Sequence, residues 1–254
     1  MGNTLSAGHL RSCDEGNRPV AVDQHEVAYL GSTTEAPGVA TFMFSRPEGY
    51  AFDPGQFLSL TLETREGTQT KHFTICSAPG DPGLAITTRL TGSAFKDALL
   101  ALVSGSQVAI TGPRGAMTLR LGEKKVAFLV GGIGVTPARC IVRDAVQRGG
   151  GPTLLVFYGN LDQDSIPFKA EFDAYERDHP EISVVHVLAE PKAGWKGDTG
   201  FITAEIVRRH TDPLDGWHWV VAGPPAMVDA MKRVLEELAI PADRVSMEVF
   251  AGYE

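Results

Sequence analysis

The stretch VAFLVGGIGVTPAR, residues 126–139, contains the transition that decides the fold. Its continuous apolar run is typical of a strand buried on both faces of a parallel sheet. The glycines that follow let a ligand approach the backbone closely, and Pro137 suits the first turn of a helix. Thr136 is the expected N-cap, with a hydroxyl that is also free to face a ligand. The stretch therefore predicts a strand, a turn and a helix N-terminus, where an anion could bind. A plain glycine-rich turn is the alternative, because the spacing departs from the G-x-G-x-x-G dinucleotide fingerprint.

Three further apolar runs follow: LLVFY (154–158), VVHVL (184–188) and HWVVA (218–222). Helical patterns separate or follow them at 137–148, 168–178 and 226–239, so this half is expected to be a doubly wound α/β domain with a parallel sheet. The segment AGPPAMV (222–228) again leads from a buried strand into a helix N-terminus at the same sheet edge. Two such loops favour ligand binding over a plain turn. Met227 and Met231 have helical spacing and are read as core residues.

The first half has a different pattern, with short alternating segments separated by Gly and Pro. These are VATFMFSRP (39–47), GQFLSLTLET (55–64), KHFTICSAP (71–79), LAITTRLTG (84–92) and SQVAITGP (106–113). They predict a small antiparallel β-barrel. One helix interrupts it, with Ser93 as its N-cap and an apolar stripe of Phe95, Leu99, Leu102 and Val103. The expected organisation is an N-terminal extension (1–20), the barrel (21–121) and the α/β domain (122–254).

Composition limits the function classes. The net charge of −8 argues against nucleic acid or an anionic membrane as a partner. No apolar run reaches the roughly 20 residues of a membrane span, and no signal peptide is visible, so a cytoplasmic protein is expected. The start MGNTLS fits a loose myristoylation pattern. Cys13, Cys76 and Cys140 form no CxxC pair, which argues against a metal or iron–sulfur site within the chain.

The barrel half also has candidate ligand contacts. KHFTICS brings a cation, an aromatic ring and a hydroxyl together at Lys71, Phe73 and Thr74, although an exposed strand would look the same. Gly92 and Ser93 in TGSAF lie at a predicted helix start, with Arg89 just upstream. Two anion-binding positions suggest a diphosphate ligand.

The order of these motifs resembles that of the ferredoxin–NADP reductase family of flavoproteins. The family's Arg-x-Tyr-Ser is matched by conservative variants in residues 71–74, and its Gly-x-x-Ser segment is matched loosely by Gly92 and Ser93. Its Gly-Gly-x-Gly-x-Thr-Pro is matched fully by residues 131–137. Its Cys-Gly-Pro-Pro is matched by residues 222–225, with Ala222 in place of the cysteine. MEVF (247–250) is similar to its Glu-x-aromatic ending.

The resemblance implies FAD on the barrel and NADH or NADPH on the α/β domain, with hydride passing to flavin N5. Implied flavin contacts are Lys71, His72, Phe73, Thr74, Thr88, Arg89, Gly92, Ser93 and Ala94. Implied nicotinamide-nucleotide contacts are Gly131, Gly132, Gly134, Thr136, Pro137, Gly159, Asn160, Gly223, Pro224, Pro225 and Met227. Thr74, Glu248 and Phe250 are implied in catalysis: Thr74 near N5, Glu248 in proton delivery and Phe250 as a cover for the flavin.

Two further expectations concern specificity and partners. Asp162 and Asp164 follow the second α/β strand, where they would repel a 2′-phosphate, so NADH is favoured, although Lys192 and Lys196 could reach over. Electrons would pass to a separate acceptor, such as a ferredoxin or an oxygenase component. A basic patch near the junction (Arg114, Arg120, Lys124 and Lys125) could dock an acidic protein or simply be solvated. The alternatives are a reductase that uses free flavin as a substrate and a non-catalytic subunit of a larger complex.

Overall fold

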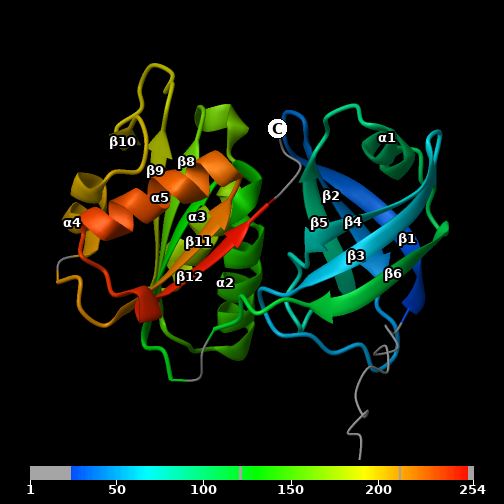
Figure 1. Cartoon of the computed structure of the whole chain (residues 1–254), viewed down its shortest axis with the longest axis horizontal. Coiled ribbons are helices and arrows are strands. Elements are labelled where there is room, and N and C mark those ends of the chain that lie inside the picture. The colour runs from blue at the N-terminus through cyan, green and yellow to red at the C-terminus, as the bar shows by residue number, and fades with distance from the viewer. Residues whose placement is uncertain (1–23, 120–121, 212, 251–254) are drawn as a thin grey trace, which may run out of the picture.

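The computed structural model describes residues 24–119, 122–211 and 213–250, and the expectations placed on Cys13, Arg120 and the first six residues lie outside these ranges. The first half is a six-stranded antiparallel sheet that curls into a barrel (Figure 1), with the order β4-β3-β6-β1-β2-β5. Beyond the last residue of β4, the Cys76 N–H donates to the Ala85 carbonyl of β5 at 2.8 Å. The strands are β1 (Gln24–Ala36), β2 (Val39–Ser45), β3 (Phe57–Thr64), β4 (Gly67–Thr74), β5 (Gly83–Arg89) and β6 (Gln107–Arg114).

Helix α1 (Ala94–Leu100) lies where the sequence predicts it. Ser93 is its N-cap and accepts a hydrogen bond from the Lys96 N–H, and Phe95 and Leu99 are buried. The expectation for Val103 is wrong. The helix ends at its C-cap, Ala101, so Val103 lies beyond the apolar stripe and is 70% exposed.

The second half is a six-stranded parallel sheet in the order β10-β9-β8-β7-β11-β12, which confirms the predicted α/β architecture. Its strands are β7 (Lys125–Gly131), β8 (Thr153–Asn160), β9 (Ile182–Leu188), β10 (Asp198–Thr199), β11 (Trp217–Gly223) and β12 (Val245–Val249). Its helices are α2 (Thr136–Arg148), α3 (Lys169–Asp178), α4 (Ala204–Thr211) and α5 (Pro225–Glu237), with short 3₁₀ helices η1 (Gly132–Val135), η2 (Gln163–Ser165) and η3 (Ala242–Arg244).

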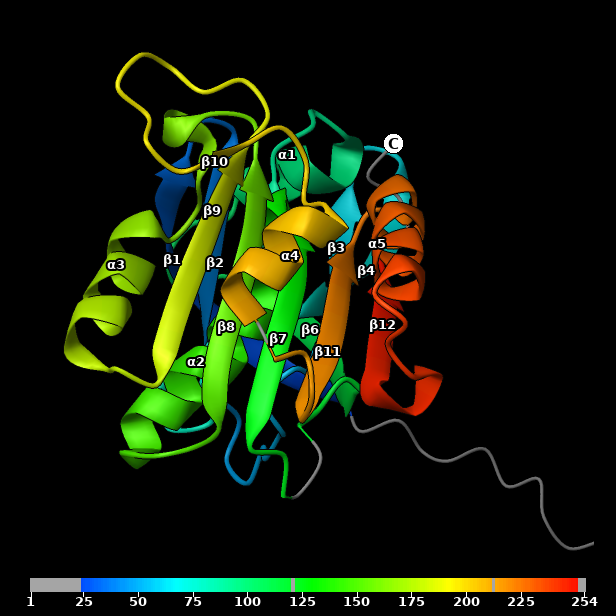
Figure 2. The same ribbon diagram turned by 90° about the vertical axis from the view of Figure 1, so that its left-hand side faces the viewer.

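Alternation along β7 explains the two layers of helices. Val126, Phe128 and Val130 pack with α2 and α3, whereas Ala127 and Leu129 pack with α4 and α5 on the opposite face. Figure 2 shows the sheet between these two helical layers. A strand with both faces covered must be apolar throughout, which is why the continuous runs predicted these strands. Within the described residues, none of the helices is both long and apolar enough to cross a bilayer.

A polar cluster joins the barrel to α2 and α3; we call it the interdomain cluster and define it as Asp81, Arg139, Arg143, Glu171 and Tyr175. Arg143 donates to both carboxylate oxygens of Asp81, at 2.7 and 2.8 Å. Arg139 donates to the Cys76 carbonyl at 2.7 Å and to Glu171 at 2.8 Å. The end of KHFTICS is therefore in direct contact with the helix that follows GGIGVTP.

Candidate cofactor cleft

The nucleotide-binding loop, residues 131–137, follows β7 directly. Its glycines are required by its close contact with the end of β11: a Cβ on Gly134 would lie 2.3 Å from the Ala222 carbonyl oxygen. Gly132 has φ +50°, a conformation that favours glycine. The loop thus exposes backbone rather than side chains, as a pyrophosphate site requires.

The role expected of Thr136 needs correction. The chain passes from η1 into α2 without a break, so Val135 is the N-cap and Thr136 is the first helical residue. Thr136 is buried, and its hydroxyl donates to the Ile133 carbonyl at 3.1 Å. Its hydroxyl proton therefore holds the loop rather than facing a ligand. Pro137 lies in the first turn of α2, as expected.

The second loop lies beside the first, because β11 pairs with β7. Pro224 is the N-cap of α5 and Pro225 is its first residue. Met227 packs against the backbone of both loops: a Cβ on Gly131 would lie 2.6 Å from its sulfur, and one on Gly223 3.0 Å from it. This placement agrees with the reading of Met227 and Met231 as packing residues of this half.

Two buried polar atoms at this sheet edge have no hydrogen-bond partner among the described residues. They are Nδ2 of Asn160, at the end of β8, and Oε2 of Glu248, on β12. Glu248 of β12 is opposite Ala222 of β11, and Gly159, the residue before Asn160, is opposite Gly131 of β7. Both atoms therefore lie at the sheet edge that holds the two loops. Burial raises the pKa of the Glu248 carboxyl. Orphaned polar atoms beside a glycine cradle fit a polar ligand such as a nicotinamide nucleotide.

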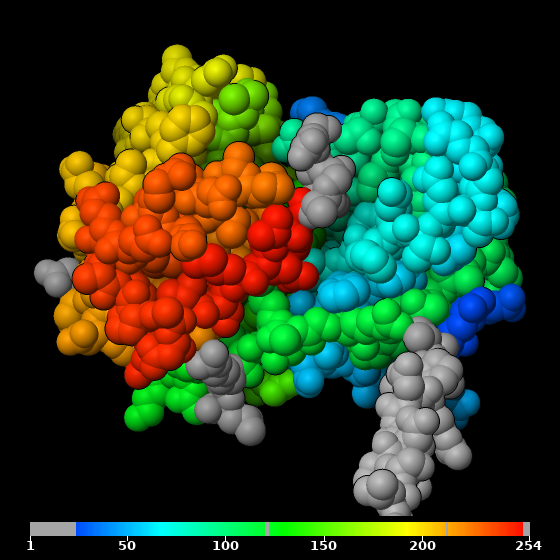
Figure 3. Space-filling view, viewed as in Figure 1, coloured from blue at the N-terminus to red at the C-terminus, as the bar shows by residue number. Residues whose placement is uncertain are grey.

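The barrel lies against the other side of this edge, and we call the junction between them the cofactor cleft. The Phe250 N–H donates to the Gly223 carbonyl at 2.9 Å, and its ring packs against Ile133 of the loop and Ala36 and Val39 of the barrel. Arg89 of β5 reaches the loop, since a Cβ on Gly132 would lie 3.2 Å from its Nη2. Figure 3 shows the end of β12 at the seam between the two halves.

The flavin side of the cleft contains most of the residues that the resemblance implies. Phe73 is buried at the end of β4, beside Phe95 of α1, and Thr74 is buried next to it. Thr88 is buried and accepts a hydrogen bond from the ammonium of Lys96, which lies over the Phe73 ring. Phe73 was expected to be available for the isoalloxazine; it lies instead in the barrel core, under this ammonium. The donor set of cations and hydroxyls suits a phosphorylated cofactor.

His72 differs from its neighbours in orientation. Its Nδ1 is hydrogen-bonded to the Ser59 hydroxyl at 2.7 Å, and its ring packs on Phe57. Successive strand residues point to opposite faces, so His72 shares a face with Thr74 and not with Lys71 and Phe73, and its ring is already engaged by Ser59 and Phe57. Gly92 has φ +70° and open space around it, and Ala94 is buried. We omit His72 from the proposed flavin contacts.

Sequence reasoning missed three groups in or near the cleft. Tyr158 donates from its hydroxyl to the Gly132 carbonyl at 3.1 Å and so supports the loop from β8. Lys96 and the interdomain cluster were also not anticipated. The signals in the sequence were weak, because an isolated Tyr, Lys or Arg gives no indication of which distant segment it meets.

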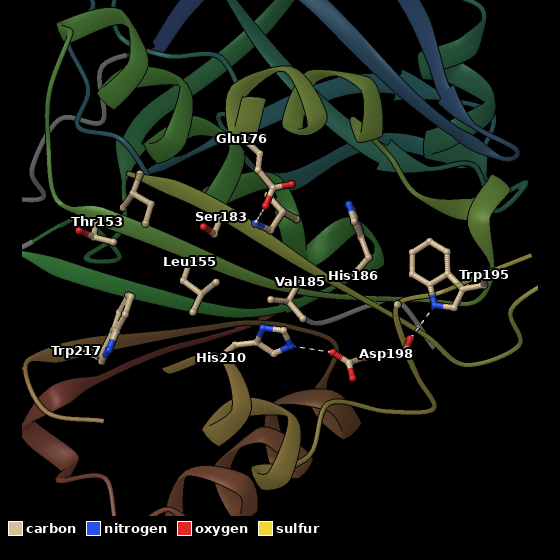
Figure 4. Close-up of a pocket in the computed structure, with 13 residues that line it drawn as sticks. Thr153, Leu155, Glu176, Ser183, Val185, His186, Trp195, Asp198, His210 and Trp217 are labelled. Atoms are coloured by element: carbon tan, nitrogen blue, oxygen red, sulfur yellow. Dashed lines mark hydrogen bonds and ion pairs between the residues drawn. The ribbon is translucent and has the colours of Figure 1, made fainter. Parts of the chain in front are cut away.

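A separate hollow lies elsewhere in the α/β half. It has a volume of about 560 Å³ and surrounds β9 between α3 and α4, lined among others by His186, Trp195 and His210 (Figure 4). Its lining includes Trp217 at the start of β11, the end of that strand opposite to loop 222–225, so it is separate from the cofactor cleft.

Comparison with known proteins agrees with this geometry. Residues 128–233 match the oxidoreductase NAD-binding domain family. NADH-cytochrome b5 reductase 1 of Neosartorya fischeri is 29% identical over 213 residues, covering 77% of this chain and 69% of that protein. The counterpart from Mortierella alpina is 27% identical, covering 80% and 71%.

Solved structures share the whole fold. A cytochrome P450 reductase from Amycolatopsis has a TM-score of 0.79 at 22% identity, covering 94% of this chain and 73% of that one. A ferredoxin NADP+ reductase from Neisseria gonorrhoeae, with bound FAD and NADP, has a TM-score of 0.74 at 18% identity, covering 89% and 98%.

These comparisons agree with the resemblance seen in the motifs: residues 128–233 match an oxidoreductase NAD-binding domain, and the chain shares its two-part fold with the solved reductases.

Glu248 gives a first test of the cleft. Its raised pKa means that the folded state disfavours the ionised carboxyl. The resulting loss of stability is absent below the ordinary pKa of 4.5, develops as the pH rises from there through the folded value, and is complete above it. We expect Glu248→Gln to raise the melting temperature at pH 7 by about 2–4 °C, and the gain to vanish in acid. Glu205→Gln, at an exposed position on α4, is the control and should leave the melting temperature unchanged at each pH. An equal rise in melting temperature at all pH values would contradict the reading of Glu248 as a buried carboxyl with a raised pKa.

Proposed function

We propose that this chain transfers hydride from NADH to FAD across the cofactor cleft and passes the electrons to a separate electron-transfer protein. Bound FAD supplies the chemistry of accepting a hydride and releasing its electrons one or two at a time. The observation that carries the proposal is the direct meeting of the two halves: Phe250, Ile133 and Val39 pack together where the glycine loop faces the barrel.

The residues of the chain contribute binding and orientation. The backbone of residues 131–134 and the start of α2 would hold the pyrophosphate of NADH, while Gly223 and Pro224 would position the nicotinamide. Phe250, packed beside Ile133 and Val39, would cover the site and exclude water from it, and would move aside or lie beside the nicotinamide. Glu248, with one oxygen unpartnered, would hold a proton at its carboxyl at the nicotinamide end.

The preference for NADH is supported by the charges after β8. Asp162 caps η2 by accepting hydrogen bonds from the Asp164 and Ser165 N–H groups. Lys192 does reach this edge, as the sequence left open, but it pairs with both Asp162 and Asp164. The pair of carboxylates leaves the edge with a net negative charge, which repels a 2′-phosphate.

We therefore expect kcat/KM for NADH to exceed that for NADPH by about tenfold or more. Steady-state assays with both nucleotides and one artificial acceptor measure the ratio. The double variant Asp162→Ser, Asp164→Ser frees Lys192 and should shift the ratio towards NADPH. A wild-type preference for NADPH would refute the proposal for this edge.

The acceptor is proposed from the relatives alone. Since several relatives are named NADH-cytochrome b5 reductases, a small haem protein is the first acceptor to test, and an iron–sulfur protein is the second. The basic patch gives little support for either. Lys125 begins β7 and so lies at the opposite end of the sheet from the loop, with its ammonium over the Trp217 ring.

One purification and one assay distinguish this function from the alternatives. The proposal expects a yellow protein that reduces a cytochrome b5 or a ferredoxin catalytically with NADH. A colourless protein that turns over only with added flavin would support a free-flavin reductase. Reduction of bound flavin without turnover towards any soluble acceptor would support a subunit of a larger complex.

A further inference from the structure

Lys96, on the first turn of α1, is a buried cation in the barrel. The residue is only 8% exposed. Its ammonium donates to the Thr88 hydroxyl at 2.5 Å and lies 4.4 Å from the centroid of the Phe73 ring. The Phe95 ring lies farther away, at 5.8 Å. This side chain is therefore held by residues of three separate elements, β4, β5 and α1.

The surroundings penalise this charge. Burial, and then the neighbouring charge of Lys71, lower the pKa of the Lys96 ammonium to about 8. Lys71 is itself exposed on β4 and is an implied phosphate contact. Because the charge of Lys71 acts on Lys96, the two cations repel each other, and an anion that contacts both would stabilise them.

We propose that Lys96 acts with Lys71 as a second cation that binds the diphosphate of a flavin nucleotide. The inference rests on the flavin site described above and deepens it. Lys71 replaces an arginine of the family motif and so lacks the bidentate fork of a guanidinium. A second ammonium, fixed by Thr88 and the Phe73 ring, supplies the charge that this replacement loses. An ammonium binds phosphate as a point charge, so its effect should follow the number of phosphates in the ligand.

The test compares three ligands on the full-length protein after removal of its flavin: riboflavin, FMN and FAD. We expect Lys96→Met to raise the Kd for FAD by about 10- to 100-fold, the range of a charge-assisted hydrogen bond, and that for riboflavin by less than about twofold. Fluorescence titration gives all three constants. Lys169→Met, at a lysine of α3 paired with Asp173, is the matched control and should leave them unchanged.

Lys96→Gln keeps a hydrogen-bond donor for Thr88 but removes the charge, so it should reproduce the loss for FAD. In the unmodified protein, the side-chain nitrogen NMR signal of Lys96 should shift with FAD and not with riboflavin. Equal losses for riboflavin and FAD, an unchanged Kd for FAD, or an NMR shift with riboflavin alone would overturn the inference. Failure of the wild-type protein to bind any flavin would instead overturn the flavin site itself.

Discussion

Replacing Gly134 by alanine should lower kcat/KM for NADH by about 100-fold or more, since a displacement of roughly 1 Å at a reacting centre has effects of this size. The added Cβ would lie 2.3 Å from the Ala222 carbonyl oxygen and 3.0 Å from the Gly223 Cα. Both are backbone atoms, which cannot rotate away, so the loop or the end of β11 must shift. Steady-state kinetics with NADH measure the loss, and the flavin spectrum checks that FAD remains bound.

Gly150→Ala is the matched control. Gly150 lies in the same half of the molecule, just after α2, and a Cβ there would meet nothing within 4 Å. This variant should keep wild-type kinetics. Activity of Gly134→Ala within about twofold of wild type would show that the two loops are not held together during catalysis.

Arg143→Met should both destabilise the protein and slow hydride transfer, because Arg143 links the barrel to the α/β half. It donates two hydrogen bonds to Asp81, and its side chain is 31% exposed while that of Asp81 is 12% exposed. After allowance for solvent screening, we expect the free energy of unfolding to fall by about 1–3 kcal/mol. Urea unfolding measures this, and rapid-mixing reduction of the flavin by NADH measures the transfer rate.

The partner variant, Asp81→Asn, adds a pH signature. Burial alone would raise the pKa of Asp81, but hydrogen bonds from Arg143, the Ala78 N–H and Gln147 outweigh it and lower the pKa below 3.8. The stabilisation is therefore complete above the ordinary value and is lost as the pH falls through the lower folded value. Asp81→Asn should be less stable than wild type at pH 7, and the difference should disappear in acid.

Arg177→Met is the control for both variants, because Arg177 is exposed on α3 and, among the described residues, pairs with its neighbour Asp178. Its stability should equal that of wild type at every pH. A difference between Asp81→Asn and wild type that stays constant down to the acid limit would contradict the role given to the cluster.

The sequence predicts the α/β half well for a physical reason. Strands covered on both faces must be apolar at every position, so local patterns predict four of its six strands and the helices α2, α3 and α5. Helix α4 and the edge strand β12 were not predicted. The barrel is harder. The first strand, β1, was not predicted: it contains polar exposed residues, and its pairing with β2 shifts register near Gly31 and near Glu35. The two-residue β10 has no pattern of its own.

The site shows the same limit. Loops 131–137 and 222–225 were found because glycine and proline constrain the backbone locally. The hydroxyl of Thr136 was misjudged because η1 leads into α2 without a separate N-cap. Lys96 was missed because a lysine is normally expected at the surface, and only the fold brings Thr88 and Phe73 around it. Contacts between Arg143 and Asp81 likewise join residues 62 positions apart.

The account depends most on FAD and NADH meeting in one cleft, and anaerobic mixing of the purified protein with NADH deuterated at the transferred position tests this directly. The flavin absorbance should bleach in a single turnover, with a primary isotope effect on the rate and deuterium lost from the nucleotide. A protein that binds both cofactors yet shows no bleaching would contradict the account.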